Sequence, residues 1–393
     1  MLNKIANEKI KQACDYLAKS EADLWLIYSS EGSDPAVSLL TGLKTVGKTF
    51  FLLLGDGTRI CIASIIDVQE HEDSGLFSKV IGYRDDPADI LQEVVDKINP
   101  NKIMLNFSLT DYLCDGITAG RFRYLETTLC DYADKFVSSE AILSRVRSIK
   151  SPEEISMIMR AIEITQDIYG DVFAAVRPGM TEYEVGKLFV EGMKKRGVIN
   201  GVSKDLSMPI VMKDRISHRD PGDAVINPGD FLIFDFGVSY NGYCADIART
   251  AYFLKEGESR APERFEDMFD AAHNAITKAF QAIMPGVEGW TVDDAARSYL
   301  HSRGMPDITH STGHQVGQFV HDGGAMFAPR WERYGQAAYG IIEAGMVLTL
   351  EPTILNPDGD FSVLCEENIL VTDSGAEFLS VRQDELILIP FSH

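Results

Sequence analysis

The sequence predicts an α/β protein, with some α+β character, built from two domains. Three observations support this prediction. The chain has 393 residues, more than one domain usually holds. Helix-like and strand-like segments alternate through the first 145 residues, and a set of local motifs recurs in the rest of the chain. With 45% hydrophobic residues, the chain can bury a sizeable core.

Residues 1–145 form the expected N-terminal α/β domain. Helical periodicity covers residues 4–19 and 87–98, and apolar strand-like runs cover residues 23–28, 49–54, 59–63 and 102–107. This order predicts a largely buried sheet. Its acidic residues and its one histidine, His71, form no convincing ligand cluster. We therefore expect this domain to serve dimerisation or specificity.

The second domain is expected at residues 151–393, after a polar connector at 143–150. Ser151-Pro-Glu-Glu154 predicts a helix start with a serine cap, a proline at the first helical position and a glutamate that completes a capping box. The helix that follows has an ordinary apolar face.

The second domain contains two similar halves. Three motifs occur in the same order, roughly 110 residues apart. They are Pro178-Gly179 and Pro285-Gly286, Thr181-x-x-Glu184 and Thr291-x-x-Asp294, and Arg196-Gly197 and Arg303-Gly304. This spacing is too long for a solenoid, so we expect two pseudo-symmetric α/β halves packed face to face.

Each half also carries a hairpin with two acidic residues. In the first, apolar runs containing Asp235 and Asp246 flank the turn-forming dipeptide Asn241-Gly242. In the second, Glu351 and Glu367 lie on strands joined by a turn near 356–360. We expect the four acids to meet where the two halves face one another.

Four neighbouring carboxylates require a cation, because buried like charges repel and lose their hydration. His310, His314 and His321 lie within twelve residues, among only eight histidines, and we expect an imidazole ligand from this segment. Such a ligand set suits two divalent cations such as Mn²⁺, Fe²⁺, Co²⁺ or Zn²⁺. A water that bridges two such ions can attack an amide carbonyl without a protein nucleophile.

Composition excludes several other classes. The six cysteines show no ligand spacing, which fits reduced thiols. A formal charge of −22 disfavours nucleic acid and anionic membranes as partners. No apolar run is as long as a membrane-spanning helix, which needs about 20 residues. The first residues also lack the apolar core of a signal peptide. We therefore expect a cytoplasmic protein.

Five motifs follow one another in the second domain: Asp235-Phe-Gly, Asp246-Ile-Ala-Arg-Thr, His310-x-x-Gly-His314-x-Val-Gly-x-x-x-His321, Leu350-Glu351-Pro and Glu366-Glu367-Asn. Together they resemble the motifs of the pita-bread metallopeptidases, which include methionine aminopeptidase, prolidase, aminopeptidase P and creatinase. The resemblance implies a pseudo-twofold pita-bread catalytic domain after a creatinase-like α/β domain. Because methionine aminopeptidases lack the N-terminal domain, it points to the Xaa-Pro dipeptidase and Xaa-Pro aminopeptidase branch.

The resemblance also implies roles for single residues. The metal ligands would be Asp235, Asp246, His314, Glu351 and Glu367, with Glu351 also moving the proton of a metal-bridging hydroxide. His218, His310 and His321 would contact the substrate. The implied cofactor is a pair of divalent ions, first of all Mn²⁺, with Co²⁺, Zn²⁺ and Fe²⁺ as alternatives. The implied substrate is an Xaa-Pro dipeptide or short peptide, and the implied assembly is a homodimer or larger.

The sequence departs from the family pattern at several positions. Prolidase-type members usually have an arginine two positions before the last glutamate, where this chain has Cys365. Asp322 replaces the usual glutamate after His321, and Thr353 stands where glycine is common. We hypothesise that Arg330 or Arg333 provides the missing cation for a substrate carboxylate. Two alternatives stay open: a hydrolase or lyase of a small non-peptide metabolite, and a non-catalytic binding protein on the same fold.

Overall fold

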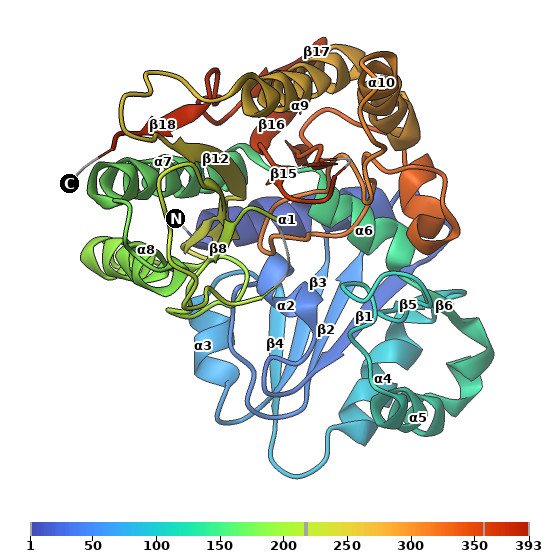
Figure 1. The fold of residues 1–393 in the computed structure, drawn as a ribbon. Coiled ribbons are helices and arrows are strands. Elements are labelled where there is room, and N and C mark those ends of the chain that lie inside the picture. The colour runs from blue at the N-terminus through green and yellow to red at the C-terminus, as the bar shows by residue number, and fades with distance from the viewer. Residues whose placement is uncertain (1, 216–218, 357, 392–393) are drawn as a thin grey trace. The chain divides into compact units, whose positions relative to one another are not determined.

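The computed structural model describes residues 2–215, 219–356 and 358–391 (Figure 1). The chain divides into two compact units, Met1–Arg147 and Ser148–His393. Each unit has its own layers of helices and strands, and each is described here by itself.

The first unit is built on a six-stranded mixed sheet in the order β4-β3-β2-β1-β5-β6. The strands are β1 Leu24–Ser29, β2 Thr49–Leu54, β3 Arg59–Ser64, β4 Lys79–Tyr83, β5 Ile103–Leu105 and β6 Phe136–Ser138. Strands β1, β2 and β3 pair antiparallel, whereas β4, β5 and β6 join in parallel. The predicted α/β domain with a buried sheet is therefore present.

Helices cover both faces of this sheet, because alternate residues along each strand point to opposite sides. Trp25, Ile27 and Phe51 pack with α1, α2 and α6, whereas Leu26 and Leu52 pack with α4 and α5. The helices are α1 Leu2–Leu17, α2 Pro35–Leu40, α3 Val68–Asp73, α4 Ala88–Ile98, α5 Ala119–Thr128 and α6 Glu140–Ser148, with a 3₁₀ segment at Cys130–Lys135.

The second unit begins with two capped helices. α7 (Pro152–Ala175) and α8 (Glu182–Arg196) each start with the predicted capping box, at Ser151 and Thr181. The strands that follow are β7 Ile199–Asn200, β8 Ile210–Lys213, β9 Phe231–Phe236, β10 Val238–Tyr240, β11 Tyr243–Cys244 and β12 Ile247–Phe253. β8, β9 and β12 form a sheet with the C-terminal strand β18 in the order β18-β12-β9-β8.

A second pair of helices and further strands complete this unit. They are α9 Glu263–Ala282, α10 Gly289–Ser302, a 3₁₀ segment η2 at Glu332–Tyr339, β13 Val347–Leu350, β14 Ile354–Leu355, β15 Ser362–Val363, β16 Glu367–Thr372, β17 Gly375–Phe378 and β18 Ile387–Ile389. α10 starts at Gly289 rather than at the predicted Thr291 cap, and the Thr291 hydroxyl donates to the Glu288 carbonyl at 2.7 Å.

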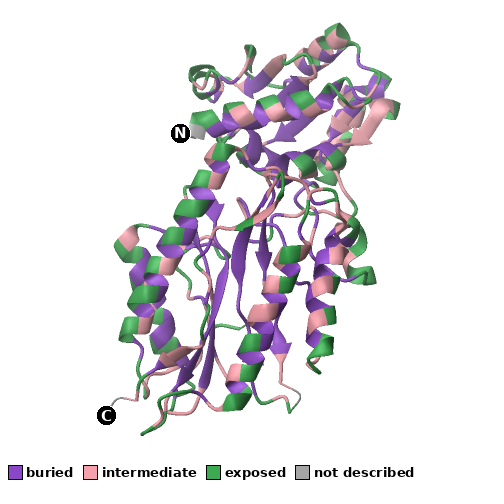
Figure 2. Ribbon diagram, turned by 90° about the horizontal axis from the view of Figure 1, so that it is seen from above, coloured by how far each residue is buried: buried purple, intermediate pink, exposed green. Residues whose placement is uncertain are grey.

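Buried strands run through both units, with half-exposed helices along them (Figure 2). In the second unit, α9 and α10 pack on β13 and β16 through an apolar cluster that includes Phe231, Phe265, Leu348 and Ile369. Such burial at about 25 cal/mol per Å² is the main stabilising contribution to this layer. Among the described helices, none is long and apolar enough to cross a membrane.

Candidate metal centre and catalytic pocket

The first predicted hairpin is present and places two acids near one end. β9 and β12 pair antiparallel with Asp235 opposite Ala248, and Asp246 lies directly before β12. The hairpin turns at Asn241 (φ 50°) and Gly242 (φ 87°), the two positive φ values that a type I′ turn requires. Asp235 and Asp246 therefore lie on neighbouring strands.

The second hairpin places two further acids beside them. β13 and β16 pair antiparallel with Leu350 opposite Glu367. One step further along the same register, Glu351 faces Glu366. Because successive side chains in a strand point to opposite faces, Glu366 and Glu367 cannot serve the same site.

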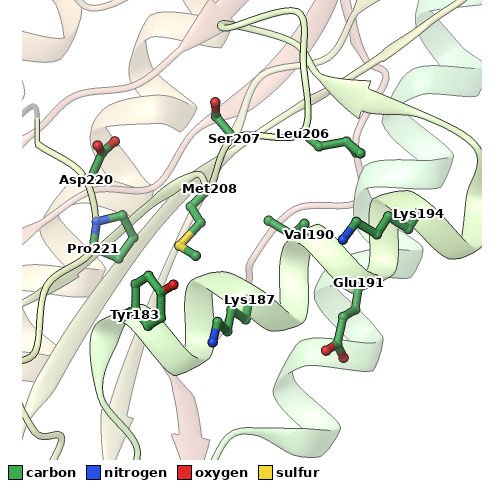
Figure 3. A pocket seen from close by; sticks show the side chains of 10 residues that line it. All are labelled: Tyr183, Lys187, Val190, Glu191, Lys194, Leu206, Ser207, Met208, Asp220 and Pro221. Carbon is green, nitrogen blue, oxygen red and sulfur yellow. The ribbon is translucent and has the colours of Figure 1, made fainter.

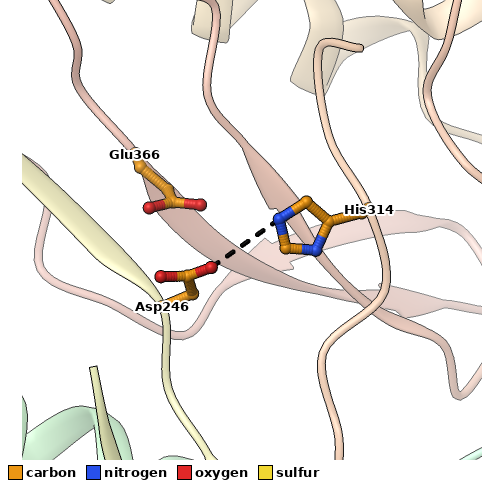
Figure 4. A group of neighbouring side chains, drawn as sticks. All are labelled: Asp246, His314 and Glu366. Carbon is orange, nitrogen blue, oxygen red and sulfur yellow. Dashed lines mark ion pairs between the residues drawn. The ribbon is translucent and has the colours of Figure 1, made fainter. Parts of the chain in front are cut away.

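Glu366, and not Glu367, belongs to the acidic cluster. Asp246, His314 and Glu366 each offer a ligand atom within 4.8 Å of the others, and all three residues are buried (Figure 4). Nε2 of His314 lies 3.6 Å from Oδ2 of Asp246, the pair joined by the dashed line in Figure 4, and 3.3 Å from Oε1 of Glu351. Two acids from each half thus surround one imidazole, since Asp235 lines the same pocket.

Glu367 instead forms a structural ion pair, so its expected role as a ligand is corrected. Its Oε1 lies 3.2 Å from Nη1 of Arg249 and accepts a hydrogen bond from the Gln383 N–H at 2.9 Å. Its Oε2 accepts from the Ser380 hydroxyl at 2.5 Å. Both side chains of the Arg249–Glu367 pair are buried, and the carboxylate has its full set of partners on the face turned away from the cluster.

Backbone pairing fixes His314 beside Glu351. The Thr349 N–H donates to the His314 carbonyl at 2.9 Å, and the Glu351 N–H donates to the Thr312 carbonyl at 2.8 Å. Gly313 permits this approach, because a Cβ there would lie 2.0 Å from the Thr349 carbonyl oxygen. Nδ1 of His314 lies 3.2 Å from the Gln315 carbonyl, which can only accept a hydrogen bond. Nδ1 therefore carries the proton and Nε2 offers its lone pair to the cluster.

Burial shifts the pKa values of the cluster strongly. Desolvation and neighbouring carboxylates raise the pKa values of Asp246, Glu351 and Glu366 well above their usual range. Desolvation, followed by the charge of His321, lowers the pKa of His314 to about 3. Among the described residues, Oε1 of Glu366 is buried without a hydrogen-bond partner. A neutral imidazole and several crowded carboxylates suit divalent cations of intermediate hardness.

These shifts also set the direction of a pH effect in the metal-free protein. Above the ordinary carboxyl pKa, the folded state holds protons that the unfolded chain releases, so stability falls as pH rises through the raised pKa values. His314 acts in the opposite direction, because its contribution is lost only as pH falls from 6.5 towards 3. Above about pH 6.5 only the carboxyl effect of this cluster remains.

The cluster lies in a pocket of about 540 Å³. The lining residues come from the 200–210 segment, from the stretch at 219–220 and from the elements that carry the cluster. They are Asn200, Val202, Ser203, Ser207, Met208, Pro209, Ile210, Arg219, Asp220, Asp235, Phe236, Gly237, Asp246, His314, Val320, His321, Glu351 and Glu366. The Lys204 ammonium holds the 200–210 segment in place by donating to the Gln318 carbonyl and the Cys244 sulfur, each at 2.8 Å.

The other predicted histidines are placed differently from one another. His321 lines the pocket, and its ring centroid lies 4.4 Å from that of His314. His310 is not among the lining residues. Its Nδ1 lies 2.7 Å from the Ser311 carbonyl and its Nε2 lies 2.7 Å from the Thr353 hydroxyl. His218 falls outside the described residues, so its predicted role stays a prediction.

The two arginines proposed as carboxylate anchors do not line the pocket, which contradicts that hypothesis. The guanidinium of Arg330 lies 4.1 Å above the Trp290 ring, and Arg333 donates to the Thr309 carbonyl while stacking on Trp331. With Glu366 in the cluster, the position two residues before the glutamate is Leu364 rather than Cys365, and Leu364 is buried and apolar. The arginine expected from the family pattern is therefore still missing.

The cation that does reach the pocket is one that the sequence analysis overlooked. Arg219 is the single lysine or arginine among the described lining residues. Its guanidinium forks onto the buried Glu182 carboxylate at 2.8 and 3.1 Å. Glu182 also accepts from the backbone N–H groups of Lys213 and Gly222. This ion pair fixes one rim of the pocket, and the Arg219 charge is balanced by that of Glu182.

Comparison with known proteins identifies the family. The sequence pattern of Metallopeptidase family M24 matches residues 156–373, more than half of the chain. The chain belongs to metallopeptidase family M24. The acidic cluster and its pocket lie within this M24 region, and the members of the family are divalent-metal-dependent peptidases. The protein is therefore a metallopeptidase.

Similar proteins cover more than nine-tenths of this chain. An uncharacterized peptidase from Staphylococcus aureus (strain USA300) is 27% identical over 378 residues, covering 95% of this chain and 98% of that protein. The Xaa-Pro dipeptidase from Bacillus anthracis has a TM-score of 0.78 at 22% identity, with 98% of this chain and 99% of that chain covered. The X-Pro aminopeptidase from Thermotoga maritima has a TM-score of 0.77 at 24% identity, with 94% and 98% covered. The shared architecture confirms the predicted pita-bread fold after an N-terminal domain.

Proposed function

We propose that this M24 member is a dinuclear metal-dependent hydrolase that cleaves the Xaa-Pro bond of dipeptides or short peptides. The observation that carries the proposal is the group of Asp235, Asp246, His314, Glu351 and Glu366 in one pocket. The names of the similar structures, an Xaa-Pro dipeptidase and an X-Pro aminopeptidase among them, support the choice of substrate.

The ligand set suits two divalent cations. Four carboxylates would balance the four positive charges, and the Nε2 lone pair of His314 adds a nitrogen ligand. Carboxylate-rich sites favour Mn²⁺, and we propose it as the native metal, with Co²⁺, Zn²⁺ and Fe²⁺ as alternatives. Bound ions of this kind polarise a carbonyl and lower the pKa of a coordinated water.

The protein's own residues would then bind the peptide and move the proton. Glu351 has a raised pKa and lies beside His314, so its carboxylate can accept a proton and return it to the leaving proline nitrogen. His321 lines the same pocket, where its ring can hydrogen-bond the substrate. We further propose that His218 contacts the substrate from the segment before Arg219.

Localisation and assembly complete the proposal. All six cysteines are unpaired, five of them buried, which fits a reducing cytoplasm. We propose a homodimer or larger assembly, with the N-terminal unit serving dimerisation or specificity. Size-exclusion chromatography with light scattering tests the assembly directly.

Metal removal and replacement test the proposed activity. The protein is treated with a chelator, dialysed, and assayed after addition of Mn²⁺, Co²⁺ or Zn²⁺ on matched Xaa-Pro and Xaa-Ala peptides. We expect hydrolysis of the Xaa-Pro series only, lost with the metal and restored by its return. A metal-loaded protein that leaves every Xaa-Pro peptide intact would overturn the proposal, and hydrolysis of a non-peptide metabolite would then be examined.

A further inference from the structure

A second pocket of about 560 Å³ lies beside α8 (Figure 3). It is lined by Tyr183, Lys187, Val190, Glu191, Lys194, Leu206, Ser207, Met208, Asp220 and Pro221. Ser207, Met208 and Asp220 line both pockets, so the two cavities share one wall. The two pockets are therefore neighbours, separated by these side chains.

One face of α8 forms the floor of the second pocket. Tyr183, Lys187, Val190 and Lys194 recur at intervals of three or four residues, the spacing of a single helix face. Figure 3 shows this face turned towards the segment that carries Leu206 and Met208. The pocket therefore combines apolar side chains from two elements with two lysines.

The two lysines are available for a ligand anion. Both are exposed, and the Lys187 ammonium lies 4.6 Å above the Tyr183 ring. Within the part of the chain that the structure describes, no ion pair is recorded for Lys187 or Lys194, although Lys195 lies 3.6 Å from Asp171. Glu191 also borders the pocket, and in Figure 3 its carboxylate and the Lys187 ammonium both point away from the 206–208 segment.

The catalytic pocket, in contrast, offers no comparable cation. Its one described lysine or arginine is Arg219, whose guanidinium is forked onto Glu182. Leu364 occupies the position of the arginine expected from the family pattern. The carboxylate of a bound dipeptide would lie among the cluster acids, whereas the carboxylate of a longer peptide could lie further away.

The position of the cleaved bond determines which end of a longer peptide extends beyond the catalytic pocket. An Xaa-Pro hydrolase binds a single residue on the amino side of the broken bond, so any longer part of the substrate lies on the carboxyl side. We propose that the second pocket binds the C-terminal end of peptides of three or more residues. Lys187 and Lys194 would bind the terminal carboxylate, and Val190, Leu206 and Met208 would contact an apolar side chain.

This inference rests on the proposed Xaa-Pro function, and a comparison of free and blocked peptide ends tests it. The substrate pair is Ala-Pro-Ala-Leu with a free carboxylate and with a C-terminal amide, assayed with the Mn²⁺-loaded full chain. The variants are Lys187→Gln, Lys194→Gln and the double variant. Lys195→Gln is the matched control, because it removes the same charge from α8 outside the pocket.

We expect wild type to favour the free acid over the amide in kcat/KM. Each lysine should contribute about two- to fivefold to this ratio, the usual range for an exposed ion pair. The ratio should approach one in the double variant and stay at the wild-type value in Lys195→Gln. Equal kcat/KM values for acid and amide in wild type, or an unchanged ratio in the double variant, would overturn the proposal.

Binding measurements separate this proposal from the proposed function. If no Xaa-Pro peptide is hydrolysed, the proposed function fails, and calorimetric titration of the uncleaved tetrapeptide pair still tests the pocket. A Kd that is lower for the acid than for the amide, and a loss of that difference in the double variant, would support the second pocket. Identical Kd values for acid and amide would reject it.

Discussion

Replacing Glu366 or Glu367 by glutamine tests which of the two is a metal ligand and which belongs to a structural ion pair. Glu366→Gln removes a buried carboxylate that is crowded by other acids. Because the folded state disfavours the charged form of this carboxyl, the free energy of unfolding of the metal-free variant at neutral pH should be higher than that of wild type. Its metal affinity should fall by more than the roughly 10–100-fold that loss of an outer partner costs.

Glu367→Gln should lower the free energy of unfolding and leave metal binding intact. It leaves Arg249 buried without its charged partner, and breaking a buried ion pair in this way costs about 3–5 kcal/mol. The metal stoichiometry should be retained wherever the variant is folded. Urea unfolding of the metal-free proteins and calorimetric titration with Mn²⁺ measure both effects. If Glu367→Gln loses a metal ion while Glu366→Gln binds both, the assignment of the two glutamates is wrong.

Three further predictions concern the same unit. The metal-free protein should lose stability as pH rises above 6.5, because the cluster carboxyls give up protons, and Glu366→Gln should make this loss smaller in urea unfolding at several pH values. Thr353→Val should shift the ¹⁵N resonances of His310, because it removes the hydroxyl 2.7 Å from Nε2, and Thr353→Ser should restore them. Unchanged His310 resonances in Thr353→Val would contradict this. Lys150→Met should lower unfolding free energy by about 3–5 kcal/mol, because Asp322, 2.9 Å away, is also buried, and a fall under 1 kcal/mol would contradict this.

The sequence was sufficient for most of the architecture because its local signals agree with one another. Ser151 and Thr181 begin helices with capping boxes, and Asn241-Gly242 turns the first hairpin as predicted. The Thr291 motif has the same spacing, yet Thr291 lies inside α10, and its hydroxyl donates to a carbonyl one turn earlier. A capping motif is thus a local signal that neighbouring residues can override.

Four of the five predicted metal ligands lie in the pocket, and Glu366 takes the place of the fifth, Glu367. Residues 366 and 367 are both glutamates, so residue type does not distinguish them. Only the register of β16 against β13 decides which one faces the pocket. The pairing of Leu350 with Glu367 and the ion pair in which Arg249 donates to Glu367 are both long-range features. The sequence offers Arg249 as a cationic partner for one of the two glutamates, but it does not show which glutamate pairs with it.

Long-range contacts also explain why the arginines were misjudged. Arg330 and Arg333 lie near the histidine motif in sequence, but Trp290 and Trp331 hold their guanidinium groups by stacking. Arg219 reaches the pocket because Glu182, in a helix 37 residues earlier, binds it. Proximity along the chain therefore gave no information on which guanidinium approaches the acids.

The division of the acids between two hairpins has a consequence for the lifetime of the protein. Asp235 and Asp246 come from one half of the M24 unit and Glu351 and Glu366 from the other, so a shared ion would fasten the two halves together. Without it, the acids lose this link, and they must hold protons or repel one another across the two halves. Metal starvation should therefore hasten proteolytic turnover of the chain, and the supply of the ion would control the amount of enzyme as well as its activity.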